Sequence, residues 1–271
     1  MPPSDGGGRA TSARYDVNQI AFADESHRNA SRDAPVEMPV NIIYAPVPFA
    51  VMMTTPQDLE DFAVGFSFTE GIIEAIDDIR SITVEDSERG LKLIISLSSE
   101  KLQRHLARSR DRTGSIDSRD LTAPAPNGAV PVTPQAIRRA LDDLSKAQAL
   151  NAITGAVHAA AWCGRDGGIL AIREDVGRHN ALDKLVGHLL RGKADPLNGF
   201  LVITSRCSYE MVAKAAAFGA RALVAVSAPT SLAIERAQRF GITLVALARD
   251  DSALIFHGAV PDGDTIVTGD T

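Results

Sequence analysis

The stretch "GGILAIREDVGRHNALDK" (residues 167–184) joins an apolar run, a dense polar loop and the start of a helical pattern. The apolar run predicts a buried strand over 168–173. The spacing of the next apolar residues predicts a helix over 178–191; they are Ala181, Leu182, Leu185 and Leu189. A strand that leads into a helix is half of a βαβ unit. The polar residues between them are then expected at the carboxyl end of a sheet, where α/β proteins bind their ligands.

The same alternation of strand and helix patterns continues toward the C-terminus. It predicts strand 200–204, helix 208–218, strand 222–227, helix 230–240, strand 242–248 and a short strand 253–257. A helix opened by Thr133 and Pro134 precedes this region and runs to about residue 150. Alternating strands and helices are typical of an α/β fold with a parallel sheet covered on both faces. We therefore expect an α/β domain over residues 133–260.

The first half of the chain is organised differently. Residues 1–35 are rich in Gly, Ser, Arg and Asp and predict a flexible tail. Residues 36–101 predict a small α+β domain with two strands, a helix that Thr55 caps and Pro56 opens, and a hairpin. Residues 102–132 are rich in Arg, Asp, Ser, Gly and Pro, and they predict a long flexible loop.

The composition and net charge of the chain indicate which kinds of partner to expect. The chain has 271 residues, 45% of them hydrophobic, and a net charge of −6. This charge gives no general attraction to nucleic acid or to an anionic membrane, so we expect neither as a partner. The N-terminus has no apolar signal-peptide core and no segment approaches a membrane span, so we expect a cytoplasmic protein. With only Cys163 and Cys207, we expect neither a disulfide framework nor a cysteine-based metal site.

Four of the predicted strands run into polar loops. These loops lie at 173–175, 205–207, 228–231 and 249–252. The carboxyl ends of such strands converge on one crevice, so together the loops predict a ligand site. Four arginines suit a phosphate-bearing ligand, and two aspartates could accept hydrogen bonds from a base or sugar; they are Arg173, Arg178, Arg206 and Arg249, with Asp175 and Asp250. Ordinary helix caps and surface turns remain the alternative for any single loop.

Familiar catalytic motifs are absent from the sequence. It contains no GxxxxGK[ST] phosphate loop and no HExxH, and the glycines at 164–168 precede a predicted strand rather than follow one. Two histidines have plausible site contexts. His179 is expected to contact a ligand, with a capping or surface role as the alternative. For His158, a ligand contact and an ordinary core position are both open.

Five long segments, at 54–73, 154–161, 173–187, 204–219 and 226–249, resemble the FdhD family of formate dehydrogenase accessory proteins, and within it the FdsC-like members. The resemblance implies a cytidine-deaminase-like α/β domain without the zinc. It also implies binding of the molybdenum bis(molybdopterin guanine dinucleotide) cofactor, with GDP or GMP as partial mimics. The expected partners are a formate dehydrogenase catalytic subunit, a cysteine desulfurase and a second copy of the chain.

The predicted cofactor-binding residues fall into two groups. The family's cofactor-contacting stretch maps onto Leu247, Ala248, Arg249, Asp250, Asp251 and Ser252. The other polar loops add Arg173, Asp175, Arg178, His179, Ser205, Arg206, Ser227 and Thr230.

The sequence departs from the family at a CxxC motif. Members typically carry a cysteine pair there that holds a persulfide, whereas "RTGSIDSR" (112–119) has Ser115 and Ser118 in those positions. A hydroxyl cannot carry a transferable sulfane sulfur. Cys207, at a predicted helix N-terminus, could replace the pair, although a small packed residue is the simpler interpretation. Cys163 resembles a turn residue.

These observations give one leading hypothesis and two alternatives. The leading one is an accessory protein that binds the molybdenum cofactor and delivers it to apo formate dehydrogenase without passing sulfur through a CxxC. The first alternative is a sulfurtransferase that uses Cys207 to pass sulfur from a desulfurase to the cofactor. The second is a nucleotide-processing enzyme, ranked last because neither zinc ligands nor a paired acid and base are visible.

Overall fold

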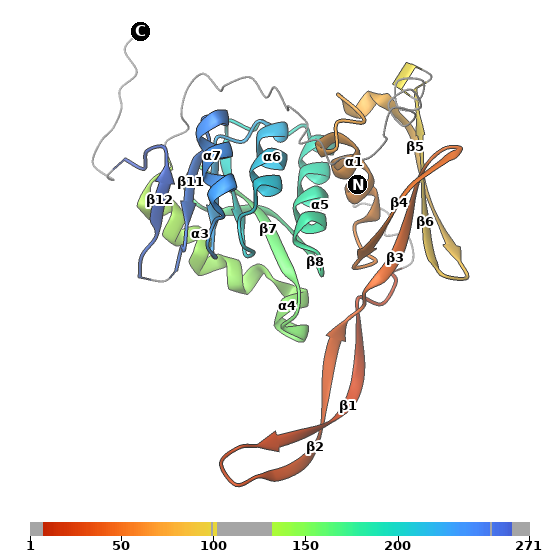
Figure 1. The fold of residues 1–271 in the computed structure, drawn as a ribbon, viewed down its shortest axis with the longest axis vertical. Coiled ribbons are helices and arrows are strands. Elements are labelled where there is room, and N and C mark those ends of the chain that lie inside the picture. Colours follow the sequence, from red (N-terminus) through yellow and green to blue (C-terminus); the bar gives the residue numbers. More distant parts are fainter. Residues whose placement is uncertain (1–7, 99, 102–131, 250, 262–271) are drawn as a thin grey trace.

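The computed structural model describes residues 8–98, 100–101, 132–249 and 251–261, and its centre is a six-stranded sheet (Figure 1). The strand order is β12-β11-β10-β9-β7-β8. The strands are β7 (His158–Gly164), β8 (Ile169–Asp175), β9 (Gly199–Ile203), β10 (Ala222–Ala225), β11 (Thr243–Ala246) and β12 (Leu254–His257). The predicted α/β class is confirmed.

The sheet is mixed, which corrects the expected all-parallel arrangement. Strands β9, β10 and β11 pair in parallel, whereas β7 is antiparallel to both β8 and β9, and β12 is antiparallel to β11. Strand β7 was not predicted. Its sequence HAAAWCG has no β-branched residue and no alternation, because its residues from Ala159 to Gly164 are buried on both faces.

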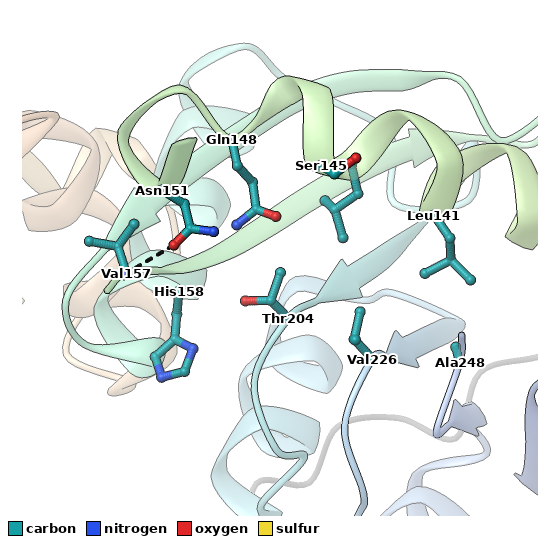
Figure 2. A pocket seen from close by; sticks show the side chains of 10 residues that line it. Leu141, Ser145, Gln148, Asn151, Val157, His158, Thr204, Val226 and Ala248 are labelled. Carbon is teal, nitrogen blue, oxygen red and sulfur yellow. Dashed lines mark hydrogen bonds between the residues drawn. The ribbon is translucent and has the colours of Figure 1, made fainter. Parts of the chain in front are cut away.

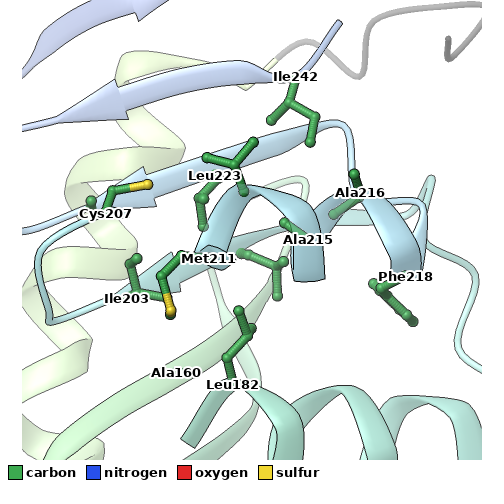
Figure 3. Close-up of a cluster of buried hydrophobic side chains, with 14 of the residues drawn as sticks. Ala160, Leu182, Ile203, Cys207, Met211, Ala215, Ala216, Phe218, Leu223 and Ile242 are labelled. Atoms are coloured by element: carbon green, nitrogen blue, oxygen red, sulfur yellow. The ribbon is translucent and has the colours of Figure 1, made fainter. Parts of the chain in front are cut away.

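Helices cover both faces of this sheet and create two hydrophobic cores. Helices α5 (Arg178–Arg191), α6 (Tyr209–Phe218) and α7 (Ser231–Phe240) pack on one face. On the other face lies α3 (Pro134–Ala147), followed by the short α4 (Ala149–Thr154). Alternate residues of β7 divide between the cores: Ala160 and Trp162 face α5 and α6, and Ala161 and Cys163 face α3 (Figure 3 shows part of the first core).

The smaller N-terminal unit is a four-stranded sheet with one helix. Its strand order is β4-β3-β6-β5, and β3 pairs in parallel with β6. The elements are β3 (Met38–Tyr44), β4 (Val47–Thr54), α1 (Leu59–Thr69), a 3-10 turn η1 (Ile76–Asp78), β5 (Ile79–Ser87) and β6 (Gly90–Leu97). The predicted strands and hairpin are confirmed. The expected cap is wrong, because α1 begins at Leu59 and Thr55 contacts β8 instead.

Residues 12–35 form a long β-hairpin, which corrects the expected flexible tail. Strand β1 (Ser12–Ala21) pairs antiparallel with β2 (Ser26–Pro35) over its whole length. In Figure 1 this hairpin projects away from the rest of the chain. We call it the arm. Its residues are mostly polar on both faces, so the sequence lacks the one-sided alternation that identifies a half-buried strand.

The two units meet where α1 packs on α5. Gly65 of α1 and Gly187 of α5 sit at the crossing, and a methyl group on either would overlap a backbone carbonyl oxygen of the other helix. The helices therefore approach backbone to backbone. Within the described ranges, no helix combines the length and apolar character needed to cross a membrane.

Candidate functional site

A cavity of about 360 Å³ opens at the carboxyl edge of the central sheet (Figure 2). Three of its lining residues directly follow strands: Thr204 after β9, Val226 after β10, and Ala248 shortly after β11. His158, at the start of the antiparallel β7, lies at the same edge because it pairs with Asp175 at the end of β8. The strand ends therefore converge on one crevice.

Helices α3 and α4 form the opposite wall of this crevice. Their contribution is Leu141, Leu144, Ser145, Gln148 and Asn151. Glu174 fixes the wall, since its carboxylate accepts hydrogen bonds from Leu150 N and Asn151 N, each at 2.8 Å, at the start of α4. The lining is neutral: amide, hydroxyl and imidazole groups stand over an apolar floor. Such a lining suits an uncharged heterocycle better than a phosphate.

His158 is the titratable group of this lining. Burial lowers its pKa below 6.5, the Arg178 guanidinium lowers it further, and Asp175 partly opposes both. The imidazole is therefore neutral at pH 7 and can offer one donor and one acceptor. Sequence reasoning left the role of His158 open. Gln148, Asn151 and Thr204 were missed, since their local sequence does not show that α3 and α4 fold over the strand ends.

Three arginines lie near residues that line the crevice, although none of the three lines it. Arg178 lowers the pKa of His158, Arg206 follows Thr204 by two residues, and Arg249 directly follows Ala248. Arg178 begins α5, and its buried Nε has no hydrogen-bond partner among the residues that the structure describes. Arg206 and Arg249 are exposed on the loops after β9 and β11. His179 has its Nε2 2.8 Å from Glu210 Oε2, an ion-pair distance without hydrogen-bond alignment. Burial lowers the pKa of His179, and Glu210 opposes this shift.

Other predicted residues occupy the loops between these cations. Ser205 is buried, and the backbone carbonyl of Ser227 accepts a hydrogen bond from Leu247 N at 3.2 Å. Leu247 has a φ of 52°, a left-handed conformation uncommon for a side chain of this size. Thr230 caps α7, because its Oγ1 accepts a hydrogen bond from Ala233 N at 3.2 Å.

The end of the family-derived stretch has few contacts. Ala248 lines the cavity, whereas Asp251 and Ser252 are exposed and hydrogen bond to each other at 3.0 Å. Asp250, Ser115 and Ser118 lie outside the described residues. Cofactor contact by any of these residues stays a prediction.

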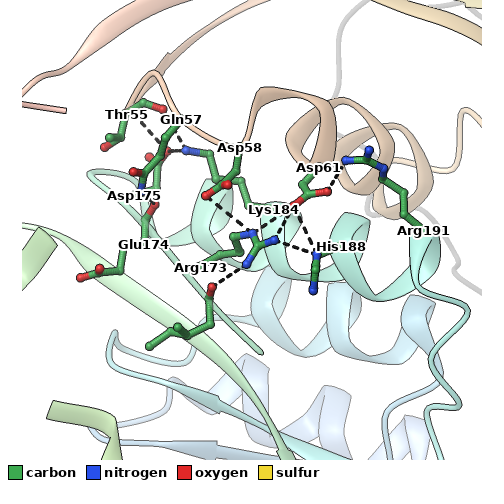
Figure 4. Close-up of polar contacts among 11 residues, drawn as sticks. Thr55, Gln57, Asp58, Asp61, Arg173, Glu174, Asp175, Lys184, His188 and Arg191 are labelled. Atoms are coloured by element: carbon green, nitrogen blue, oxygen red, sulfur yellow. Dashed lines mark hydrogen bonds and ion pairs between the residues drawn. The ribbon is translucent and has the colours of Figure 1, made fainter. Parts of the chain in front are cut away.

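Two predicted site residues instead belong to the contact between the two units, which we call the seam (Figure 4). Arg173 donates from Nε and Nη2 to Asp61 Oδ2 at 3.0 and 2.7 Å. Arg191 donates to the other oxygen of Asp61 at 2.7 Å. The charge of Arg173 is thus shared with a buried carboxylate of α1, and this contact ties β8 and α5 to the N-terminal unit.

Asp175 is the most enclosed member of the seam. Its carboxylate lies 2.7 Å from Lys184 Nζ, and neither side chain has any solvent exposure. Asp175 also accepts from Thr55 N, Gly177 N and Asn180 Nδ2 at 3.0, 2.7 and 3.0 Å. Burial lowers the pKa of Lys184, and the carboxylate opposes that shift. Every contact of this pair is internal, so the pair holds the two units together.

Both cysteines of the chain are buried. Cys207 precedes α6, where its backbone bridges to the loop before α7: Cys207 N donates to Ala228 O, and its carbonyl accepts from Thr230 N. Burial raises the pKa of its thiol to about 12. Cys163 lies within β7, not in a turn as expected, and its pKa is also raised to about 12. A low-pKa nucleophile at the helix start is therefore not found at Cys207.

Comparison with known proteins agrees with this architecture. The chain is 46% identical over 230 residues to a protein of Xanthomonas euvesicatoria named sulfur carrier protein FdhD, covering 81% of this chain and 82% of that protein. It is 42% identical over 247 residues to the protein of that name from Bordetella petrii, covering 88% and 87%.

A solved structure shares the fold. It is a crystal structure from Desulfotalea psychrophila of a protein proposed to be a formate dehydrogenase accessory protein, with a TM-score of 0.72 and 25% identity. The match covers 92% of this chain and 98% of that one. The family model of FdhD/NarQ proteins matches residues 35–260, from the end of the arm to the residues after β12. The chain therefore belongs to the FdhD/NarQ family.

Proposed function

We propose that this protein is an accessory factor for a molybdenum formate dehydrogenase, and that it binds the bis(molybdopterin guanine dinucleotide) form of the cofactor as cargo for the apoenzyme. Membership of the FdhD/NarQ family supports the accessory role. The observation that carries the binding step is the neutral, partly polar cavity at the sheet edge, together with the arginines that follow its lining residues in the chain. A guanine dinucleotide has both a neutral base and charged phosphates.

The cavity supports recognition of the base. Its volume of about 360 Å³ is enough for one nucleobase but too small for the whole cofactor. Guanine presents a carbonyl acceptor and several N–H donors on its edges. Gln148, Asn151 and the neutral His158 offer complementary donors and acceptors within the lining.

The surrounding cations support recognition of the phosphates. Arg178 has an unused, buried Nε, and Arg206 and Arg249 extend from adjacent loops. Guanidinium groups form paired, charge-assisted hydrogen bonds to phosphate oxygens. The molybdenum-bearing part of the cofactor would then lie outside the cavity, where the apoenzyme can reach it.

The alternative function is sulfur transfer, which the names of the Xanthomonas and Bordetella relatives favour. In this chain it would require Cys207 or Cys163, the only cysteines. Both thiols are buried with pKa values raised to about 12, so neither offers a thiolate to a desulfurase. We therefore rank cargo binding first. Pairing with a second copy and contact with a desulfurase stay predictions.

The test is nucleotide-specific protection against unfolding. GDP at a hundredfold excess over its dissociation constant should stabilise the protein by about 2.7 kcal/mol, and ADP at the same concentration should protect much less. Equal protection by both would argue against guanine recognition.

A matched pair of variants locates the binding. Gln148→Leu removes an amide from the crevice wall and should weaken GDP binding by about 1–1.5 kcal/mol, roughly tenfold. Gln238→Leu makes the same change at an exposed position of α7 and should bind GDP normally. Equal affinities for the two variants would remove the cavity from the site.

A further inference from the structure

The arm makes few contacts that could stabilise it. It is a two-stranded hairpin, and among the described residues its strands pair only with each other. An isolated hairpin is marginally stable in water unless another element covers one of its faces. The FdhD/NarQ family model begins at residue 35, so the arm also lies outside the part of the chain that this model matches.

The arm exposes large apolar side chains. Tyr15 is 57% exposed and Ile20 52%, and Phe22, in the turn that joins the strands, is 93% exposed. On one face of the hairpin, Tyr15 and Val17 stand opposite Arg32 and Ala30. Ile20 lies on the other face and Phe22 in the turn, so the exposed apolar groups are spread along the arm, and a partner that contacts all of them would enclose it.

The base of the arm lies beside the mouth of the crevice. Strand β2 contacts α4, and the Arg32 guanidinium lies next to Gly155, which ends α4. Asn151 and His158 line the cavity on either side of that turn. Ile153 of α4, 53% exposed, adds an apolar group to the same region. Any macromolecule that binds the arm and α4 would therefore cover the crevice.

The charge of the arm favours a protein partner over an anionic surface. Within residues 8–35 four arginines are balanced by four acidic residues. Arg14 lies 3.3 Å from Asp33 within the arm. A nucleic acid or an anionic membrane would select a net positive arm. A balanced polar rim around aromatic and aliphatic groups is typical of protein–protein contacts.

We propose that the arm and α4 together form the docking surface for the apo formate dehydrogenase, the recipient of the cargo. This inference rests on the proposed function. A complementary surface on that partner would be an apolar recess with a mixed-charge rim beside its cofactor entrance. Docking there would join the two openings, so the cofactor would pass between proteins without entering bulk water.

The test compares two sets of exposed apolar residues. Tyr15→Ser, Ile20→Ser and Phe22→Ser are combined in an arm variant. The control variant combines Leu170→Ser and Leu197→Ser, which are exposed near the amino ends of β8 and β9, away from the crevice. Binding of the purified apo catalytic subunit of the dehydrogenase is measured by interferometry on the immobilised full chain. GDP protection is measured in parallel.

We expect the arm variant to lose at least tenfold in affinity for the apo subunit, with GDP protection unchanged and the control like wild type. Phe22→Ser alone, which leaves both strands intact, should lose several-fold and guards against a misfolded arm. Wild-type affinity in both arm variants would overturn the inference. So would an arm variant that keeps apo-subunit binding but changes from dimer to monomer, because the arm would then bind a second copy.

The two proposals fail in distinguishable ways. If GDP protects none of the proteins but binding of the apo subunit still depends on the arm, the cargo proposal fails and the docking surface stands. If GDP protects all of them equally and the arm variants bind the apo subunit normally, the docking surface fails and the cargo proposal stands.

Discussion

The seam and the crevice region both contain charged side chains, but those of the seam are buried and paired, whereas most of those near the crevice are exposed. In the seam, Asp175 and Lys184 are fully buried and each charge has a partner within 3 Å. At the crevice, the lining is neutral and the cations around it are exposed or, like Arg178, have an unused donor. Both regions draw on the same stretch, 173–184, and are separated by only a few residues along the chain.

This contrast distinguishes charged residues that stabilise the fold from charged residues that can bind a ligand. A charge whose hydrogen bonds are all made inside the protein has nothing left for a ligand, and its removal leaves a buried partner uncompensated. A donor at the surface costs the fold little and keeps its capacity for binding. Variants in the seam should therefore affect stability without affecting affinity, and variants at the crevice should do the reverse.

The largest effect is expected for Lys184→Met. It leaves the Asp175 carboxylate buried without its cation, so the free energy of unfolding should fall by about 3–5 kcal/mol in urea titrations. GDP affinity of the folded fraction should not change. Lys146→Met, at an exposed position paired with Asp143, should cost less than about 0.5 kcal/mol. A loss below about 1 kcal/mol in Lys184→Met would show that the seam pair adds little to stability.

The opposite pattern is expected for Arg249→Ala. If the guanidinium binds phosphate, GDP affinity measured by calorimetry should fall by about 1.5–3 kcal/mol. Stability should stay within about 0.5 kcal/mol of wild type, because the side chain is exposed. Arg138→Ala, on the outer surface of α3, serves as the matched control. Unchanged affinity would remove Arg249 from the site.

A smaller effect is expected for Cys207→Ala. Loss of a buried sulfur should lower stability by about 1 kcal/mol. Dehydrogenase maturation should be unaffected if the protein acts through cargo binding. Incubation with a desulfurase and radiolabelled cysteine should load no sulfur on the native protein. The variant Ser115→Cys/Ser118→Cys, which introduces a CxxC at 115–118, is the positive control. Uptake that disappears with Cys207 would favour the sulfurtransferase alternative.

The smallest effect concerns pH. Burial lowers the pKa of His179 below 6.5, so between its folded pKa and 6.5 the unfolded chain binds more protons than the folded one. The stability from this group is present above pH 6.5 and is lost as pH falls below it. His179→Gln should therefore reduce the decline in urea midpoint between pH 6.5 and 5. The wild-type protein is the reference, and a His179→Gln profile identical to that of wild type would contradict this assignment.

The sequence predicts best where burial is one-sided and local. The period of apolar residues located α5 at its observed bounds, 178–191, because one face of that helix packs on the sheet. The convergence of loops followed from topology alone. Strand β7 was missed because a strand buried on both faces lacks alternation. The arm was missed because its residues are mostly polar on both faces, so no one-sided alternation identifies its strands.

The local sequence did not predict which polar residues belong to the seam and which lie near the crevice. Arg173 and Arg178 are five residues apart, near the end of β8 and at the start of α5. What distinguishes them is Asp61, which lies more than a hundred residues earlier in the chain and, of these two arginines, accepts from Arg173. Likewise, Thr55 looks like a helix cap in sequence, yet its backbone N–H serves Asp175. Long-range partners of this kind cannot be read from periodicity or spacing.

The two buried cysteines can be used to measure how often the two helical layers open. Cys163 lies in the core under α3, and Cys207 lies in the core under α6 and α7, so one thiol sits on each side of the central sheet. A maleimide probe can react with either thiol only when its layer opens. The labelling rate of each cysteine under native conditions therefore measures how often one particular helical layer detaches. A ligand held between α3 and the strand ends should slow the labelling of Cys163 more than that of Cys207.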